Sequence, residues 1–212
     1  DPRYLHTVSM TELYQTVYKS RPPVIDGLLY SGAYILAGAP KIGKSFLVAQ
    51  LPTMSAQGEG CGAMKSIRVR FCTLHWRMIS ENPESDVYDV RRGGYRSAFC
   101  NGSNKIGNGL DEQLENFIKE PPDTKLVIID TMQKIREAGE AYSYASDYEI
   151  VGKLKQFADK HCICVLTVHH TRKQPAGDSF EMISGTTGLL GCADGSLLMQ
   201  KKKRTALEQL ST

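Results

Sequence analysis

Apolar runs bounded by turn residues alternate along the chain with segments of helical period. Strands are predicted over Tyr34–Ala37, Leu126–Ile129, Cys162–Val168 and Ser196–Met199. The central runs are continuous rather than alternating, which is typical of strands buried on both faces of a parallel sheet. Helices are predicted over 110–120, where Pro121 and Pro122 end the pattern, and over 143–161. At 212 residues, this order predicts one α/β domain with a mostly parallel central sheet.

The segment GAPKIGKS matches the pattern GxxxxGK[ST] between a short strand and a helix. Its glycines let the backbone curl so that N–H groups point at phosphate oxygens, and the following helix adds its N-terminal dipole. Lys44 is expected to reach the β- and γ-phosphates, and the Ser45 hydroxyl is expected to bind Mg²⁺. A glycine-rich turn that binds nothing is the alternative. The predicted nucleotide-binding residues are Gly38, Ala39, Pro40, Lys41, Ile42, Gly43, Lys44, Ser45 and Phe46.

Polar residues follow two of the other apolar runs. Asp130 ends the run 126–129, and an acid at the C-terminal end of a strand can hold the water shell of Mg²⁺. His169 and His170 end the run that begins at Cys162, and either could sense the γ-phosphate by a hydrogen bond; a solvated basic loop is the alternative. A zinc site on the adjacent histidines lacks further ligands at suitable spacing. Lys44, Asp130, His169 and His170 are therefore the predicted catalytic residues.

Composition narrows the class of protein only slightly. The net charge of +3 permits contact with nucleic acid without arguing for it. No apolar run approaches the roughly 18–20 residues that span a bilayer, and no signal peptide opens the chain, so no membrane contact and a cytoplasmic location are expected. The six cysteines show no CxxC spacing, and Cys162 and Cys164 are expected to be buried thiols within a strand.

The order of these pieces resembles RecA-like P-loop ATPases, and more closely the hexameric replicative helicases typified by the plasmid replication protein RepA. The resemblance covers residues 7–51 and 101–204, and the matching stretches are GAPKIGKS, LVIIDTMQKIRE, VHHTRK and ISGTTGLLGCADG. It implies a RecA-like three-layer α/β/α domain over residues 1–212, with residues 1–23 as a lead-in and the terminal strands of the family missing. It also implies an ATP hydrolase that uses ATP and Mg²⁺, forms a homo-oligomer such as a hexamer, and acts on single-stranded DNA in plasmid or mobile-element replication.

The resemblance also assigns roles to residues. Asp130 would serve the magnesium site, and His169 or His170 would couple the γ-phosphate to loops that face DNA. Residues 174–188 would form a loop that faces a central channel. Lys202 and Arg204, within the basic run KKKR, are candidates for a finger that reaches the nucleotide of a neighbouring subunit; a solvated charge run is the alternative.

Residues 52–100 depart from the family pattern. The second strand of the family ends in a glutamate that activates the attacking water, and no such strand end is evident here. Pro52 lies inside the expected helix, where proline costs about 3 kcal/mol. RVRFCTLHW is the best strand candidate, and Glu81 and Glu84 follow no recognisable strand end. The copy is therefore expected to be impaired in ATP hydrolysis.

The genetic code suggests a reason for the departure. If the last base of each codon starts the next one, HWRMI can encode Leu-Glu-Asp-Asp, and the preceding residues can encode the strand GTVLYFA. The hypothesis is that residues 52 to about 100 are read out of frame, which codons other than CAY-TGG-AGG-ATG-ATH for 75–79 would disprove. A divergent insertion is the alternative. The other functions considered are an ATP-responsive DNA-associated regulator or helicase loader without unwinding, an inactive product of a decayed gene and, more distantly, a small-molecule kinase.

Overall fold

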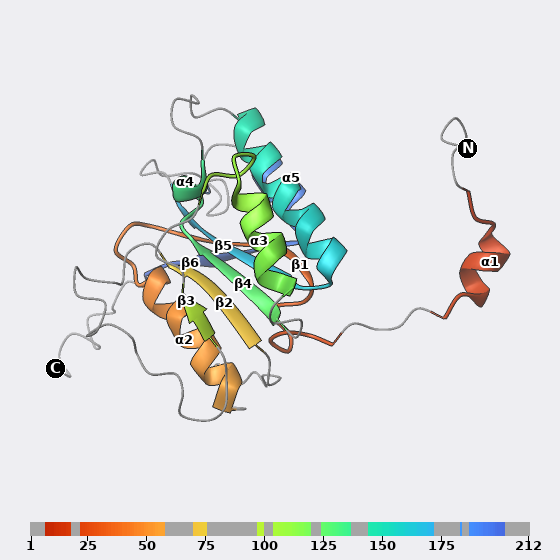
Figure 1. Cartoon of the computed structure of the whole chain (residues 1–212), viewed down its shortest axis with the longest axis horizontal. Coiled ribbons are helices and arrows are strands. Elements are labelled where there is room, and N and C mark those ends of the chain that lie inside the picture. The colour runs from red at the N-terminus through yellow and green to blue at the C-terminus, as the bar shows by residue number, and fades with distance from the viewer. Residues whose placement is uncertain are drawn as a thin grey trace.

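A computed structural model of the chain describes residues 7–17, 22–57, 70–75, 97–99, 104–119, 124–136, 144–171, 183 and 187–201. Helices and strands alternate over most of this range (Figure 1). The strands are β1 (Gly32–Gly38), β2 (Arg70–His75), β3 (Ser97–Phe99), β4 (Thr124–Asp130), β5 (Cys164–His170) and β6 (Gly195–Met199). The helices are α1 (Met10–Gln15), α2 (Lys44–Gln57), α3 (Leu110–Lys119), α4 (Met132–Ile135), α5 (Tyr144–His161) and α6 (Thr187–Cys192).

The six strands form one sheet in the order β3-β2-β4-β5-β1-β6, and every pair is parallel. β5 therefore lies between β1 and β4. The Cα register pairs Gly38 with His170, and Asp130 with both Val168 and His75. The C-terminal ends of β1, β5, β4 and β2 thus meet along one edge of the sheet, where open α/β sheets place their ligands.

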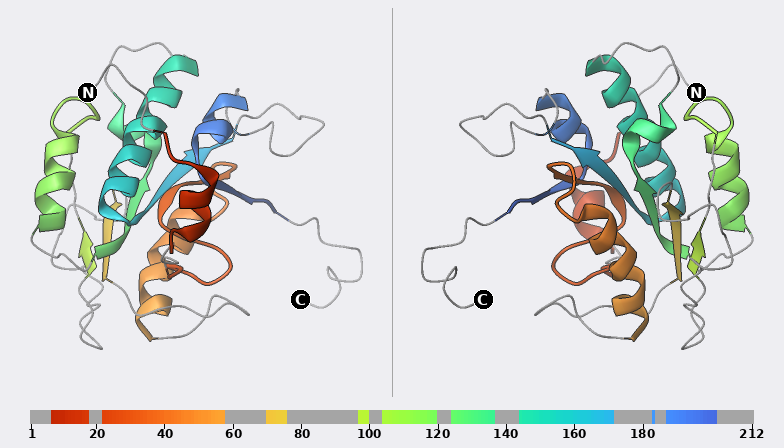
Figure 2. Two further views of the ribbon diagram at one scale, coloured as in Figure 1. Left: turned by 90° about the vertical axis from the view of Figure 1, so that its right-hand side faces the viewer. Right: turned by 90° about the vertical axis from the view of Figure 1, so that its left-hand side faces the viewer.

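Successive side chains of the central strands pack against different helix layers. Ile35, Val127 and Val165 belong to a core cluster with buried residues of α3 and α5, whereas Leu36 and Leu166 pack with residues of α2. Figure 2 shows α3 and α5 on one side of the sheet and α2 on the other. This is the RecA-like three-layer α/β/α arrangement that the resemblance implied.

The strand prediction over Cys162–Val168 was wrong at its start. α5 continues to His161, Cys162 takes a left-handed conformation (φ 54°), and β5 begins only at Cys164. The amides of Cys162 and Ile163 donate to carbonyls of the last turn of α5, so this stretch ends the helix instead of extending the strand. Cys164 is buried as expected, but Cys162 is exposed.

Within residues 52–100, which depart from the family pattern, the described parts are more regular than the sequence predicted. α2 runs through Pro52 to Gln57, and the best strand candidate is confirmed as β2, which is irregular only between Arg70 and Phe71. The reading-frame hypothesis expects the strand GTVLYFA of the shifted frame at about the positions where β2 forms in the written sequence, so β2 does not distinguish this hypothesis from a divergent insertion. No helix among the described residues is long and apolar enough to cross a membrane.

Candidate functional site

The loop between β1 and α2 has a backbone that side chains would obstruct. Lys41 and Gly43 take positive φ angles of 62° and 100°. A Cβ on Gly38 would lie 2.8 Å from the carbonyl oxygen of Met199 in β6. The loop is therefore curled, and the close approach of β6 requires a glycine at position 38, where the loop begins. The first N–H groups of α2, which lack partners within the helix, follow directly from it.

Lys44 is buried beneath this loop, and all three of its N–H groups have a partner. Its Nζ donates to the carbonyl oxygens of Gly38 at 2.7 Å and Ala39 at 2.8 Å, and lies 3.1 Å from Nδ1 of His170. Burial lowers the pKa of the ammonium group, and the nearby charge of Asp130 opposes that effect. Because an ammonium group has three protons, an added phosphate ligand must replace one of these acceptors.

Asp130 ends β4 and is 4% exposed, and Ser45 lies half-buried in the first turn of α2. Carboxylate and hydroxyl oxygens are ligands that Mg²⁺ accepts, and the ion usually takes only one or two side chains besides water and phosphate oxygens. The two residues therefore fit a magnesium ion bound together with a nucleotide. No cluster of three or more metal-ligating His, Cys, Asp or Glu residues occurs in the described part of the chain.

The two histidines at the end of β5 have different surroundings, because successive residues of a strand point to opposite faces. His170 contacts Lys44. His169 is 2% exposed, and neither of its ring nitrogens hydrogen-bonds to a described residue. Burial, then the charges of Arg136, His170 and Lys44, lower the pKa of His169 to about 4. His169 is therefore neutral at physiological pH, and His170 is the histidine in contact with the lysine of the loop.

Two further interactions at this edge of the sheet were not anticipated from the sequence. Arg136, which follows α4, forms an ion pair with Asp147 in the first turn of α5, and both side chains are 9% exposed. The amide of Thr171 donates to the Gly38 carbonyl oxygen at 3.1 Å. No local pattern distinguishes Arg136 from the exposed basic residues near it, because the burial comes from the packing of α5.

The remaining residues of the predicted site either lie on the surface of the loop or fall outside the described part of the chain. Ala39, Pro40, Lys41 and Gly43 are exposed on the loop, Ile42 is half-buried, and Phe46 is 63% exposed. Lys202, Arg204, Glu81 and Glu84 lie outside the described residues, as does most of 174–188. The structure thus brings together Lys44, Asp130 and His170, with His169 behind them.

Comparison with known proteins gives one family. A model described as an AAA domain matches residues 2–176. The match includes the curled loop, Asp130 and both histidines, and it ends before α6 and β6. A comparison with curated proteins found no match.

Proposed function

The chain belongs to the AAA domain family, and on that premise we propose that it binds ATP and Mg²⁺ at the loop between β1 and α2. The observation that carries the proposal is the meeting of Lys44, Asp130 and His170 at the C-terminal ends of three neighbouring strands. A buried cation, a buried carboxylate and a helix N-terminus at one place suit a magnesium-bound polyphosphate.

In this proposal each group has one task. The N–H groups of the loop and of the start of α2 bind phosphate oxygens, and Lys44 turns from His170 to the β- and γ-phosphates. Ser45 and Asp130 would hold Mg²⁺, which neutralises phosphate charge when it is bound. Preorganised charges of this kind position phosphate without covalent chemistry by the protein.

ATP hydrolysis is proposed to be slow in this copy. β2 ends at His75, whose Cα pairs with Asp130, so a carboxylate just after this strand would lie near the nucleotide edge. The five residues that follow are Trp76, Arg77, Met78, Ile79 and Ser80, and none is acidic. A general base typically contributes about 10²–10⁴-fold to such a reaction.

We further propose that the domain is a replicative-helicase type that acts on single-stranded DNA in replication of a plasmid or mobile element. The motif order and the basic run at 201–204 support this reading. The missing acid after β2 favours a second candidate, an ATP-responsive DNA-associated regulator or helicase loader that binds ATP without unwinding DNA.

The first experiment compares nucleotide binding and turnover. The wild-type chain should bind a fluorescent ATP analogue with Mg²⁺, and Lys44→Ala should weaken binding by about 10–100-fold, because a hydrogen bond to a charged group contributes about 1.5–3 kcal/mol. Lys119→Ala, at an exposed lysine at the end of α3, is the control and should bind normally. Equal binding by wild type and Lys44→Ala would refute the site.

The second experiment restores the acid. A Trp76→Leu/Arg77→Glu variant should raise DNA-stimulated ATP hydrolysis by about 100-fold or more, whereas Trp76→Leu/Arg77→Gln should not. Strand displacement by the restored variant supports the helicase, and ATP turnover without displacement supports the regulator. Robust hydrolysis by the wild type that is lost in Lys44→Ala would contradict the proposal of slow turnover. The proposal that the loop binds nucleotide would still stand.

A further inference from the structure

Phe46 lies in the first turn of α2 and points away from the face of the helix that packs on the sheet. Its side chain is 63% exposed, two residues after Lys44. The buried positions of α2 are Lys44, Val48 and Leu51, which follow the i, i+4, i+7 spacing of one helix face. At about 100° per residue, Phe46 lies about 200° around the helix axis from Lys44. The ring therefore takes no part in the contact between α2 and the sheet.

The neighbours of Phe46 account for the packing of the helix start. The Gly43 carbonyl oxygen accepts the amide of Leu47 at 2.9 Å, so the hydrogen bonds of α2 begin at this glycine. Leu47 packs against the core cluster on this side of the sheet. Ile42 Cγ2 lies 3.3 Å from the point where a Cβ on Gly38 would lie, so Ile42 packs on the loop itself. Phe46 is left on the solvent side of the first turn.

Met199, the last residue of β6, is a second apolar group beside the loop. Its Cε lies 3.7 Å from the point where a Cβ on Gly43 would lie, and its Cβ lies 3.3 Å from the corresponding point at Gly38. Met199 is half-buried, so part of its surface remains open. Phe46 follows Gly43 by less than one helical turn. A thioether on the β6 side and an aromatic ring at the start of α2 therefore both adjoin the loop near Gly43.

The proposed binding mode leaves the nucleoside part of the ligand without a partner. Lys44 and Asp130, which would meet the phosphates and Mg²⁺, are each 4% exposed and lie on the inner side of the loop. The ribose and base must therefore leave the loop on its exposed side. Residues 39–41 are exposed there, and none of them is aromatic. An exposed ring in the next turn is the group that suits a flat base.

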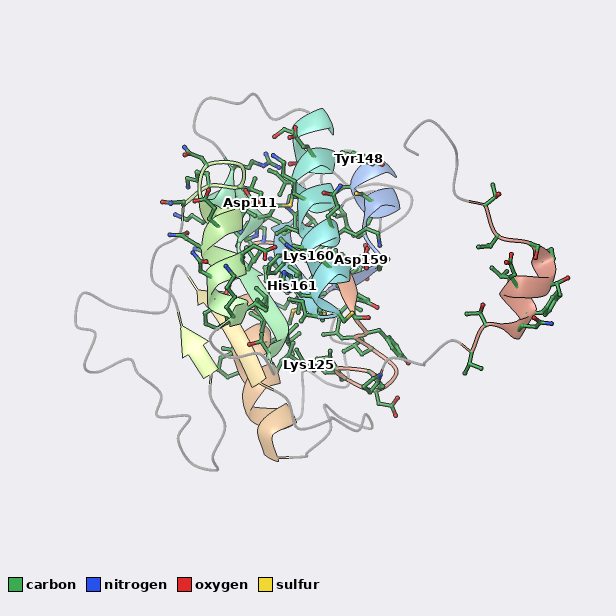
Figure 3. The ribbon with its side chains drawn as sticks, turned by 45° about the vertical axis from the view of Figure 1, so that its right-hand side comes forward. Asp111, Lys125, Tyr148, Asp159, Lys160 and His161 are labelled. Carbon is green, nitrogen blue, oxygen red and sulfur yellow. The ribbon has the colours of Figure 1, made fainter. Side chains whose placement is uncertain are left out.

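The other exposed aromatic residues of the described ranges lie away from this loop. Tyr14 belongs to α1, and Tyr30 precedes the start of β1, at the opposite end of that strand from the loop. Tyr148 lies on α5 (Figure 3), which covers the other face of the sheet from α2 (Figure 2). Phe46 is thus the exposed aromatic residue of the described part of the chain that adjoins the proposed phosphate site.

We propose that Phe46 stacks on the base of the bound nucleotide, with the Met199 side chain beside it. The inference rests on the proposed nucleotide binding, and it adds recognition of the base to a site that otherwise contacts phosphates and Mg²⁺. Every base has a π face on which an aromatic ring can stack, and a thioether is a polarizable apolar group that makes favourable contacts with rings. The site should therefore prefer nucleotides to free polyphosphates and should discriminate only weakly between purine bases.

The first test compares the binding of ADP and of inorganic pyrophosphate, each with Mg²⁺, by calorimetric titration. Phe46→Ala should weaken ADP binding by about 5–150-fold, the range that base–aromatic stacking supports, and should leave pyrophosphate binding unchanged. Lys44→Ala should weaken the binding of both ligands, because its ammonium group is proposed to contact phosphate. Phe46→Tyr retains a ring and should bind ADP like the wild type, as should Tyr148→Ala, which removes an exposed ring elsewhere.

The two ligands separate the failure of stacking from the failure of the site. Unchanged ADP binding by Phe46→Ala, or an equal loss of ADP and pyrophosphate binding, would overturn the stacking. A wild type that binds pyrophosphate as tightly as ADP would do the same and would leave the phosphate site intact. A wild type that binds neither ligand would refute the nucleotide site itself. Weaker self-association of Phe46→Ala in sedimentation, with ADP affinity intact, would assign the ring to a subunit contact instead.

The second test observes the contact by fluorescence of Phe46→Trp. The wild type has one tryptophan, Trp76, and its emission gives the background. The added indole should change its emission when ADP and Mg²⁺ are added and not when pyrophosphate and Mg²⁺ are added, because only ADP carries a base. Tyr148→Trp, the same replacement at a remote exposed ring, should respond to neither ligand. An equal response of Phe46→Trp to both ligands, or no response to bound ADP, would contradict stacking at this position.

Discussion

The contact between Lys44 and His170 predicts that a histidine variant binds ADP more tightly than the wild type does. His170 Nδ1, at 3.1 Å, is the most distant of the three acceptors of the Lys44 ammonium group, so it is the one that a phosphate oxygen replaces most easily. In His170→Ala this contact no longer has to be broken. A net hydrogen bond contributes about 1 kcal/mol, which corresponds to about fivefold tighter binding.

ADP is the informative ligand because it lacks the γ-phosphate that His170 is predicted to sense. Calorimetric titration with ADP and Mg²⁺, at a pH where histidine is neutral, gives the affinity directly. The gain in affinity should be smaller for ATP than for ADP, since His170→Ala also loses the predicted contact of the histidine with the γ-phosphate. His161→Ala, a histidine at the far end of α5, is the control and should bind ADP like the wild type. Unchanged or weaker ADP binding by His170→Ala would refute the exchange of acceptors at Lys44.

Three further predictions concern the residues around the site. Burial lowers the pKa of His169 to about 4, so the unfolded chain takes up its proton first as the pH falls. The contribution of His169 to the free energy of unfolding should therefore be fully present above about pH 6.5 and should fall by about 3 kcal/mol toward pH 4. Urea unfolding at several pH values should show this loss in the wild type and not in His169→Gln. Asp147→Ala leaves Arg136 buried without its carboxylate and should lower the free energy of unfolding by about 3–5 kcal/mol, whereas Glu149→Ala, from an exposed pair, should change it by less than about 1 kcal/mol. Gly38→Ala places a Cβ 2.8 Å from a carbonyl oxygen of β6 and should destabilise the fold by about 1–3 kcal/mol in thermal unfolding, with weaker nucleotide binding in the same titration.

Local patterns were sufficient for the elements that carry the site. Continuous apolar runs identified the three central strands, and the spacing of GAPKIGKS identified the loop, because both signals lie within a few neighbouring residues. The position of Asp130 at the end of β4 was predicted because a strand end can be read from the sequence alone.

Contacts between distant segments could not be anticipated in the same way. The choice between His169 and His170 depends on which face of β5 meets α2, and the ion pair of Arg136 and Asp147 depends on how α5 packs beside α4. The end of α5 at His161 agrees with the predicted helix 143–161, but the turn that delays β5 to Cys164 was missed because Cys162 takes a conformation that is usual for glycine. Pro52 was expected to disrupt a helix that in fact runs to Gln57.

The carbonyl oxygen of Gly38 links the loop between β1 and α2 to the end of β5. It accepts hydrogen bonds from Lys44 Nζ and from the amide of Thr171, the last residue before the basic segment that begins at Arg172. In the proposed binding mode Lys44 turns from His170 and keeps this oxygen as an acceptor, so the oxygen joins the lysine to the Thr171 amide at the end of β5. In the proposed binding mode, a displacement of Lys44 by phosphate would therefore reach the end of β5 through this single oxygen.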